Sequence, residues 1–142
     1  MDRQSLGRLA ELAVARHLAR AGYTVLERNV RLQRGELDLV AARAGVLWFV
    51  ETKSRSRDDV GPPHRAVDAR KRAALFAAAR EYVHARGHQG DWGFLVASVL
   101  LGPDGAAPRI RLLRWSVLPP TQDGFPVDGR GRHRFGRSPP FR

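Results

Sequence analysis

The sequence predicts one α/β domain, residues 1–118, followed by a basic tail, residues 119–142. Three observations support this prediction. Two long segments carry apolar residues at three- and four-residue spacing, which is typical of amphipathic helices. Hydrophobic segments of strand length lie between and after them. From Pro119 the chain becomes rich in proline, glycine and arginine and loses its periodicity, so we expect the tail to be disordered.

The two helices are expected over residues 5–21 and 68–86. Ser5 can act as the N-cap of the first helix, and Gly22 stands where a glycine often follows a helix end. Gly87 can end the second helix in the same way. The apolar positions that define the helices are Leu6, Leu9, Ala10, Ala13, Val14, Leu18 and Ala21 in the first, and Leu75, Ala78, Ala79, Tyr82 and Val83 in the second.

Five strands are expected around these helices. Residues 27–34 are basic and are predicted to form a connector, and residues 54–64, with a Gly-Pro-Pro sequence, a polar loop. The run 93–102 is continuously apolar, as in a buried strand, whereas 109–115 alternates, as at the edge of a sheet. The expected strands are residues 23–26, 36–42, 46–53, 93–102 and 109–115.

Composition narrows the classes of function. Lysine and arginine together number 25 against 14 acidic residues, so the net charge is +11. Such a surplus favours a polyanionic partner, because Lys and Arg groups that neutralise phosphates release counterions. The alternative is that the charge only keeps the protein soluble and marks no polyanionic partner. Between these alternatives we expect a nucleic-acid partner, with DNA as the first candidate.

Other features bear on the compartment. No run approaches the ~20 consecutive apolar residues of a membrane span, so no membrane partner is expected. The first residues include acids and lack the apolar core of a signal peptide. The absence of cysteine excludes disulfides and thiolate metal sites and is compatible with a reducing compartment. We therefore expect a cytoplasmic protein.

Residues 36–53 are the most informative part of the chain, because charged residues stand inside two hydrophobic strands. An even-numbered loop between the strands pairs residues whose numbers sum to 89. Asp38 then lies opposite Glu51, and Glu36 lies opposite Lys53. Opposite residues of an antiparallel pair have Cβ atoms about 5 Å apart, so the first pair brings two carboxylates to one point.

Alternation of side chains assigns the remaining residues of the first strand to faces. Leu37, Leu39 and Ala41 are expected on the face opposite the carboxylates. A four-residue loop, 43–46, is favoured over the two-residue loop Ala44–Gly45, because a two-residue turn prefers Gly or Asn at its first position.

Two opposed carboxylates repel each other unless a positive charge lies between them. For Asp38 and Glu51 the natural candidate is Mg²⁺ or Mn²⁺, since Mg²⁺ typically binds one or two carboxylates together with water and substrate phosphate. Lys53, on the same face as Glu51, can stabilise developing phosphate charge or help activate water. This arrangement suits phosphodiester hydrolysis. The alternative is a salt-bridged strand end, with an ion pair between Glu36 and Lys53 and with Asp38 facing solvent.

The ordered motifs GELDLV, LWFVETKSRSR and GPPHRAVDARKRAAL resemble those of the YraN family of small bacterial endonuclease-like proteins. The resemblance includes Asn29, Arg31 and Lys71 and runs from the first helix to about Trp115. The family is similar to the restriction-endonuclease-like PD-(D/E)xK nucleases. The resemblance implies an α/β/α core, with a central mixed sheet flanked by helices.

The resemblance also assigns roles to residues. It implies that Asp38 and Glu51 are catalytic metal ligands and that Lys53 is the catalytic lysine. It implies the carbonyl of Thr52 as a further ligand and places Glu11 beside the metal.

Four basic residues are candidates to bind nucleic acid. Arg28, Arg31 and Arg34 precede the first charged strand and can hold phosphates, although a solvated loop explains them equally well. Lys71, on the second helix, is the fourth candidate.

Two hypotheses follow. The first is a Mg²⁺- or Mn²⁺-dependent endonuclease acting on DNA, with branched repair or recombination intermediates among its candidate substrates and a homodimer as a candidate assembly. The second is a non-catalytic nucleic-acid-binding module that retains the nuclease fold. The first predicts that Asp38→Ala abolishes cleavage, and the second that it leaves binding intact.

Overall fold

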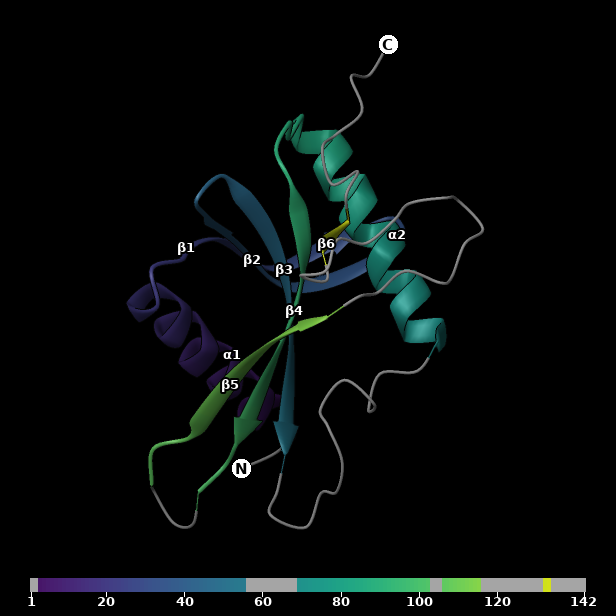
Figure 1. Ribbon diagram of the computed structural model, residues 1–142. Coiled ribbons are helices and arrows are strands. Elements are labelled where there is room, and N and C mark those ends of the chain that lie inside the picture. The colour runs from purple at the N-terminus through teal and green to yellow at the C-terminus, as the bar shows by residue number, and fades with distance from the viewer. Residues whose placement is uncertain (1–2, 56–68, 103–105, 116–131, 134–142) are drawn as a thin grey trace.

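The computed structural model describes residues 3–55, 69–102, 106–115 and 132–133, and Figure 1 shows the arrangement of their elements. The helices and the two strands after the second helix lie within two residues of their predicted bounds. The elements are α1 (Arg3–Arg20), β1 (Thr24–Leu32), β2 (Gly35–Arg43), β3 (Val46–Arg55), α2 (Ala69–Arg86), β4 (Trp92–Leu100), β5 (Arg109–Trp115) and β6 (Arg132–His133).

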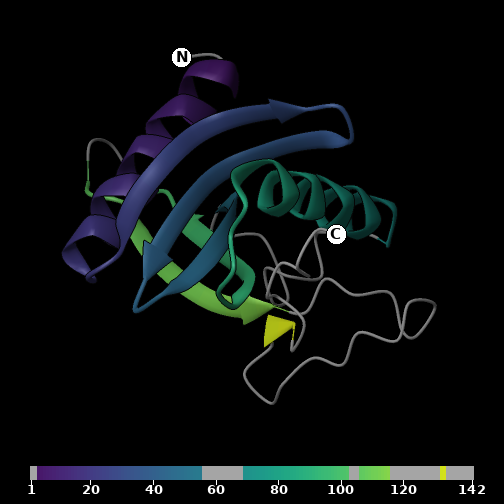
Figure 2. The same ribbon diagram turned by 90° about the horizontal axis from the view of Figure 1, so that it is seen from above.

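The strands form one mixed sheet in the order β1-β2-β3-β4-β5. Only the β3–β4 pair is parallel among the described pairs, and α2 lies in the connection that such a pair requires. The short strand β6 pairs with β4 through Trp92 and Gly93. The two helices lie on opposite sides of the sheet (Figure 2). The predicted α/β fold, a mixed sheet flanked by helices, is therefore confirmed.

Each helix covers a separate hydrophobic core. The α1 core consists of Ala10, Val14, Leu18, Leu39, Ala41, Trp48, Val50, Leu95, Ala97 and Val99. The α2 core consists of Leu37, Val40, Leu47, Phe49, Leu75, Phe76, Ala78, Ala79, Tyr82, Val83, Trp92, Phe94 and Val96. The continuously apolar strand β4 contributes to both cores, which explains why its sequence shows no alternation.

The predicted basic connector over residues 27–34 is wrong, because β1 continues to Leu32. β1 is at the edge of the described sheet, and exposed residues such as Arg28 and Arg31 interleave with partly buried ones such as Val30. An edge strand covered on one face can carry charges on the other, so its basic residues do not mark a loop.

The β2–β3 hairpin has the predicted register, because Ala42 pairs with Leu47 and Val40 with Phe49. The predicted four-residue loop is wrong, since Arg43 also pairs with Val46. The two loop residues have positive φ angles, 50° at Ala44 and 77° at Gly45. Such angles are those of a type I′ turn, whose twist matches that of the strands and outweighs the reluctance of alanine to adopt them.

Ala44→Asn is expected to stabilise the protein by about 0.5–1 kcal/mol, because asparagine tolerates the left-handed backbone better than alanine does. Urea unfolding measures the change. The opposite substitution in the same turn, Gly45→Ala, serves as the matched comparison and should lower the free energy of unfolding. No gain with Ala44→Asn would mean that this turn does not strain the alanine.

Neither described helix has the length and apolar character needed to cross a membrane. The predicted disordered tail, residues 119–142, lies outside the described residues except for Arg132 and His133 in β6. Most of the predicted polar loop, residues 54–64, lies outside them as well, although β3 extends to Arg55.

Candidate active site

The candidate site lies where β2 separates from β3. The ladder between these strands ends at the pair Leu39–Val50. Leu37 belongs to the α2 core with Val40, although strict alternation predicts it on the face of Leu39. That prediction is wrong for Leu37, because residues 35–38 no longer follow the plane of β3. The interruption of the alternation falls at Asp38.

Contacts with α2 hold this part of β2 in place. The backbone amides of Gln33 and Arg34 donate to the two carboxylate oxygens of Glu81, each at 3.0 Å. Gly35 has φ of 154°, and a Cβ there would lie 3.4 Å from the carbonyl oxygen of Ala74. The β1–β2 turn therefore sits against the helix, and the hairpin curves away from β3, as Figure 2 shows.

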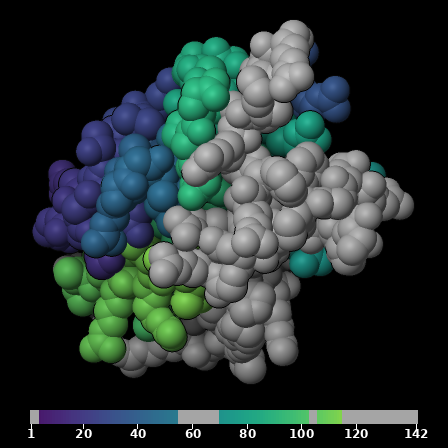
Figure 3. All heavy atoms as spheres, turned by 45° about the horizontal axis from the view of Figure 1, so that its top comes forward, coloured from purple at the N-terminus to yellow at the C-terminus, as the bar shows by residue number. Residues whose placement is uncertain are grey.

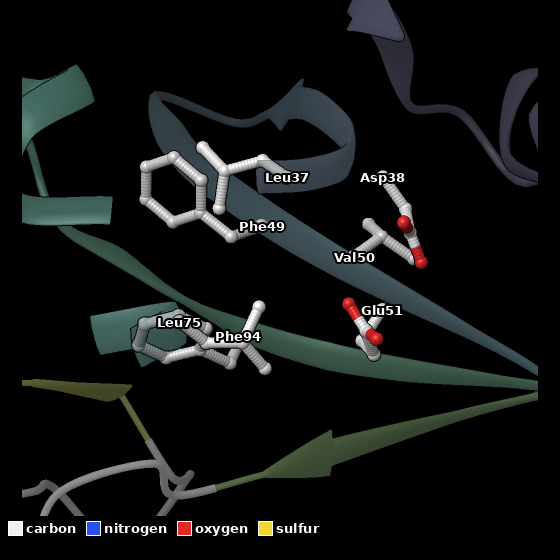
Figure 4. A pocket seen from close by; sticks show the side chains of 7 residues that line it. All are labelled: Leu37, Asp38, Phe49, Val50, Glu51, Leu75 and Phe94. Carbon is white, nitrogen blue, oxygen red and sulfur yellow. The ribbon is translucent and has the colours of Figure 1, made fainter. Parts of the chain in front are cut away.

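The carboxylates of Asp38 and Glu51 face each other across this separation (Figure 4). Oδ2 of Asp38 accepts a hydrogen bond of 2.9 Å from the backbone amide of Thr52. Oγ1 of Thr52 is buried and has no hydrogen-bond partner in the described part of the chain. The two acids also border a small, mainly apolar pocket, whose other lining residues are Leu37, Phe49, Val50, Leu75 and Phe94.

Glu51 is a buried carboxylate, with 8% of its side chain exposed. Burial, and then the negative charge of Asp38, raise the pKa of Glu51 from 4.5 to about 7. A hydrogen bond with Asp38 adds to the increase, whereas Lys71 and Lys53 oppose it. The pair of acids thus retains a proton near neutral pH, because two carboxylates this close do not both ionise readily.

Without divalent cations, the free energy of unfolding is expected to fall as the pH rises from about 5 to about 7, and then to level off. In this interval the folded protein keeps the Glu51 proton that the unfolded chain has released near pH 4.5, so the folded state binds more protons. Urea unfolding in EDTA at several pH values tests this. The decrease should be smaller in Glu51→Gln, and equal slopes in the two proteins would contradict the assignment.

Two lysines approach Glu51 from different elements. Nζ of Lys71, in the first turn of α2, lies 3.5 Å from Oε1 of Glu51. Lys53 lies two residues along β3, on the same face as Glu51, and its charge also acts on that carboxylate. From the sequence, Lys71 is predicted only to bind nucleic acid. The structure brings it to the carboxylate pair as well, by a tertiary contact between α2 and β3 that no sequence spacing reveals.

Glu11 of α1 lies near one of these acids, Asp38. Burial, and then the charge of Asp38, raise the pKa of Glu11. A hydrogen bond from the Asn29 side chain and the charge of Arg28 oppose this increase.

Asn29 has φ of 53° within β1, a strained value for a non-glycine residue in a strand. By the register of the neighbouring pairs it stands opposite Asp38. Asn29 therefore joins the site, a role that is not predicted from the sequence.

The predicted phosphate-binding arginines do not gather at one point. Arg28 acts on Glu11 through its charge, as described above. Arg31 pairs with Glu36 at 3.4 Å, and both side chains are exposed. The backbone of Arg34 is held in the β1–β2 turn by Glu81. The alternative interpretation, an ion pair between Glu36 and Lys53, is wrong, because Glu36 pairs with Arg31 of β1 instead.

The donor set fits a hard divalent cation. Asp38 and Glu51 supply two carboxylates, which is the number that Mg²⁺ typically takes from a protein alongside water and substrate oxygens. Within the described residues, no three His, Cys, Asp or Glu side chains form a cluster that could hold an ion. Glu11 and the Thr52 carbonyl thus stay predictions as ligands.

Comparison with known proteins finds matches over most of the chain. Residues 10–101 match the family model described as uncharacterised protein family UPF0102. A UPF0102 protein of Solibacter usitatus is 46% identical over 113 residues, covering 76% of this chain and 82% of the relative. A UPF0102 protein of Symbiobacterium thermophilum is 40% identical over 110 residues, covering 77% and 92%. One of Alkaliphilus metalliredigens is 34% identical over 102 residues, covering 71% and 90%.

Proposed function

Given that the chain belongs to the YraN family, UPF0102, we propose that it is a Mg²⁺- or Mn²⁺-dependent endonuclease that hydrolyses phosphodiester bonds in DNA. The observation that carries the proposal is the buried carboxylate of Glu51 facing that of Asp38, with two lysines beside them. A buried carboxylate that faces a second, partly buried one costs folding free energy, and a site for a cation gives a reason for the cost.

The residues divide into roles by position. Asp38 and Glu51 hold the metal ion, and the Thr52 carbonyl is the candidate for a third protein ligand. When bound, Mg²⁺ or Mn²⁺ supplies positive charge to the phosphate oxygens and lowers the pKa of a bound water. The amide of Thr52 keeps the Asp38 carboxylate directed at Glu51, which pre-organises the pair.

The lysines complement the acids. Lys53 lies on the same face as Glu51, where its ammonium group can neutralise charge that develops on the phosphate or orient the attacking water. Lys71 balances the charge of Glu51 from the first turn of α2. Glu11 and Asn29 lie beside Asp38 and are positioned to orient water or a ligand there.

DNA is supported as the substrate class by charge. The net charge of +11 favours a polyanion, and the charge of Arg28 acts on Glu11, which lies near Asp38. Cleavage of both strands, or of a branched junction, would require two sites, so a homodimer is part of the proposal.

Asp38→Ala is expected to abolish cleavage while the fold survives. The test compares it with wild type on duplex, single-stranded, flap and four-way-junction DNA and on duplex RNA, each with Mg²⁺, Mn²⁺ or EDTA. The matched control is Glu36→Ala, which removes a carboxylate from the same strand outside the site. Circular dichroism establishes that each variant is folded, since Asp38→Ala also loses the bond to Thr52.

Cleavage by wild type and Glu36→Ala, lost with Asp38→Ala or EDTA, would support the proposal and begin to define the substrate. Cleavage of RNA alone would change the substrate class. Binding of DNA without cleavage by any of the three proteins would overturn the proposal in favour of a non-catalytic nucleic-acid-binding module.

A further inference from the structure

A row of polar and basic residues crosses three strands beside the carboxylates. Lys53 of β3 is paired with Ser98 of β4, and Ser98 is paired with Arg111 of β5. Paired residues point to the same face of a sheet, so all three side chains lie on the face of Glu51. Because neighbouring strands are about 4.8 Å apart, the row extends about 10 Å from the catalytic lysine toward β5.

A second arginine continues this row. Arg109 lies two residues from Arg111 on the same face of β5, about 7 Å along the strand. Both arginines are exposed, and β5 is at the edge of the described sheet. Figure 3 shows residues of the 106–115 segment on the molecular surface.

Arg109 and Arg111 differ from Ser98 and Arg114, their neighbours in the sheet, in their contacts and exposure. Ser98 is buried and polar in a strand that is otherwise apolar, and it stands between Lys53 and Arg111. Arg114 lies on the opposite face, with its guanidinium 5.6 Å from the ring centroid of Trp48. Within the described residues Arg109 has no such ring contact or ion pair, and neither has Arg111.

We propose that Arg109 and Arg111 form a phosphate-binding track that leads a DNA strand across β5 to the carboxylate pair, with Lys53 and Ser98 between. The proposal rests on the proposed nuclease function and deepens it by assigning the direction in which the substrate backbone extends from the carboxylate pair. Guanidinium groups suit this task, because each presents several N–H donors that match phosphate oxygens. Such contacts position the backbone without reading its sequence, so the track predicts binding that depends little on sequence.

A different role for these arginines makes a distinct prediction. Charged side chains on an edge strand also prevent sheets from joining edge to edge. If that were their only role, their removal would cause self-association and would leave DNA affinity unchanged. Size-exclusion chromatography of the variants measures this directly.

The test is the double variant Arg109→Gln/Arg111→Gln, compared with wild type and with Arg16→Gln/Arg20→Gln. The control removes the same two charges from exposed positions on α1, which covers the opposite face of the sheet. Binding to a fluorescent duplex is measured in EDTA between about 50 and 200 mM salt, a range in which phosphate contacts dominate the salt dependence. Cleavage is measured separately with Mg²⁺.

The track predicts that the β5 variant binds about tenfold more weakly per lost contact at 0.1 M salt, and that the slope of log K against log salt falls by about 2. The α1 variant should stay within about twofold of wild type. Equal affinity of all three proteins, or equal weakening of both variants, would overturn the track. Absence of cleavage by wild type would overturn the nuclease proposal alone, because the binding comparison in EDTA still decides the track.

Discussion

A Glu51→Gln protein is expected to lose at least about 10³-fold in the rate of DNA cleavage, yet to unfold at higher urea concentration than wild type in EDTA at pH 8. The loss follows because the amide cannot replace the carboxylate as a ligand. The gain follows because the ionised Glu51 is buried beside Asp38, a placement that raises its pKa to about 7. Above that pH the folded protein carries this unfavourable charge, and Gln removes it.

The sign of the stability change distinguishes a functional acid from a structural one. The variant also loses the ion pair between Lys71 and Glu51, but the Lys71 side chain is 51% exposed, so that loss costs little. Glu36→Gln is the matched control, since its exposed carboxylate pairs with Arg31 and should affect neither property. A Glu51→Gln protein that cuts DNA normally, or that is less stable than wild type at pH 8, would contradict the assignment.

Lys53→Met is expected to lower the cleavage rate by about 10²–10⁴-fold at every pH while leaving metal binding in place. The methionine keeps most of the side-chain volume but removes the ammonium group beside the acids. Parallel measurements of Mn²⁺ affinity and cleavage separate the role of this lysine from that of the ligands.

Lys71→Met supplies the comparison for that experiment. Lys71 lowers the pKa of Glu51, so its removal should move the onset of cleavage to higher pH and leave the rate well above that onset nearly unchanged. If both lysine variants lost activity equally at all pH values, the distinct catalytic role of Lys53 would be wrong.

Local pattern predicts much of this fold and of the site. The register of the β2–β3 hairpin follows from alternation and an even loop, and Asp38 and Glu51 face each other just beyond the end of its ladder. The helices and the buried strand β4 follow from periodicity and from a continuous apolar run. These features depend on neighbouring residues, and the family resemblance adds roles to the same positions.

Features that depend on tertiary contacts could not be predicted in this way. The separation of β2 from β3 depends on the anchoring of the β1–β2 turn by Glu81. Asn29 joins the site through a positive φ angle, which no residue pattern specifies for asparagine inside a strand. The approach of Lys71 to Glu51 depends on how α2 packs across the sheet. The full length of β1 could not be predicted either, because the charges on its exposed face resemble those of a loop.

A calorimetric titration of Mn²⁺ at pH 7 is the sharpest test of the claim that Asp38 and Glu51 form a divalent-cation site. Wild type should bind about one ion per chain and release part of a proton, because metal binding requires the protonated pair to ionise. Asp38→Ala should show neither binding nor proton release, whereas Glu36→Ala should match wild type. Equal Mn²⁺ binding by wild type and Asp38→Ala, or no binding by wild type, would contradict the claim.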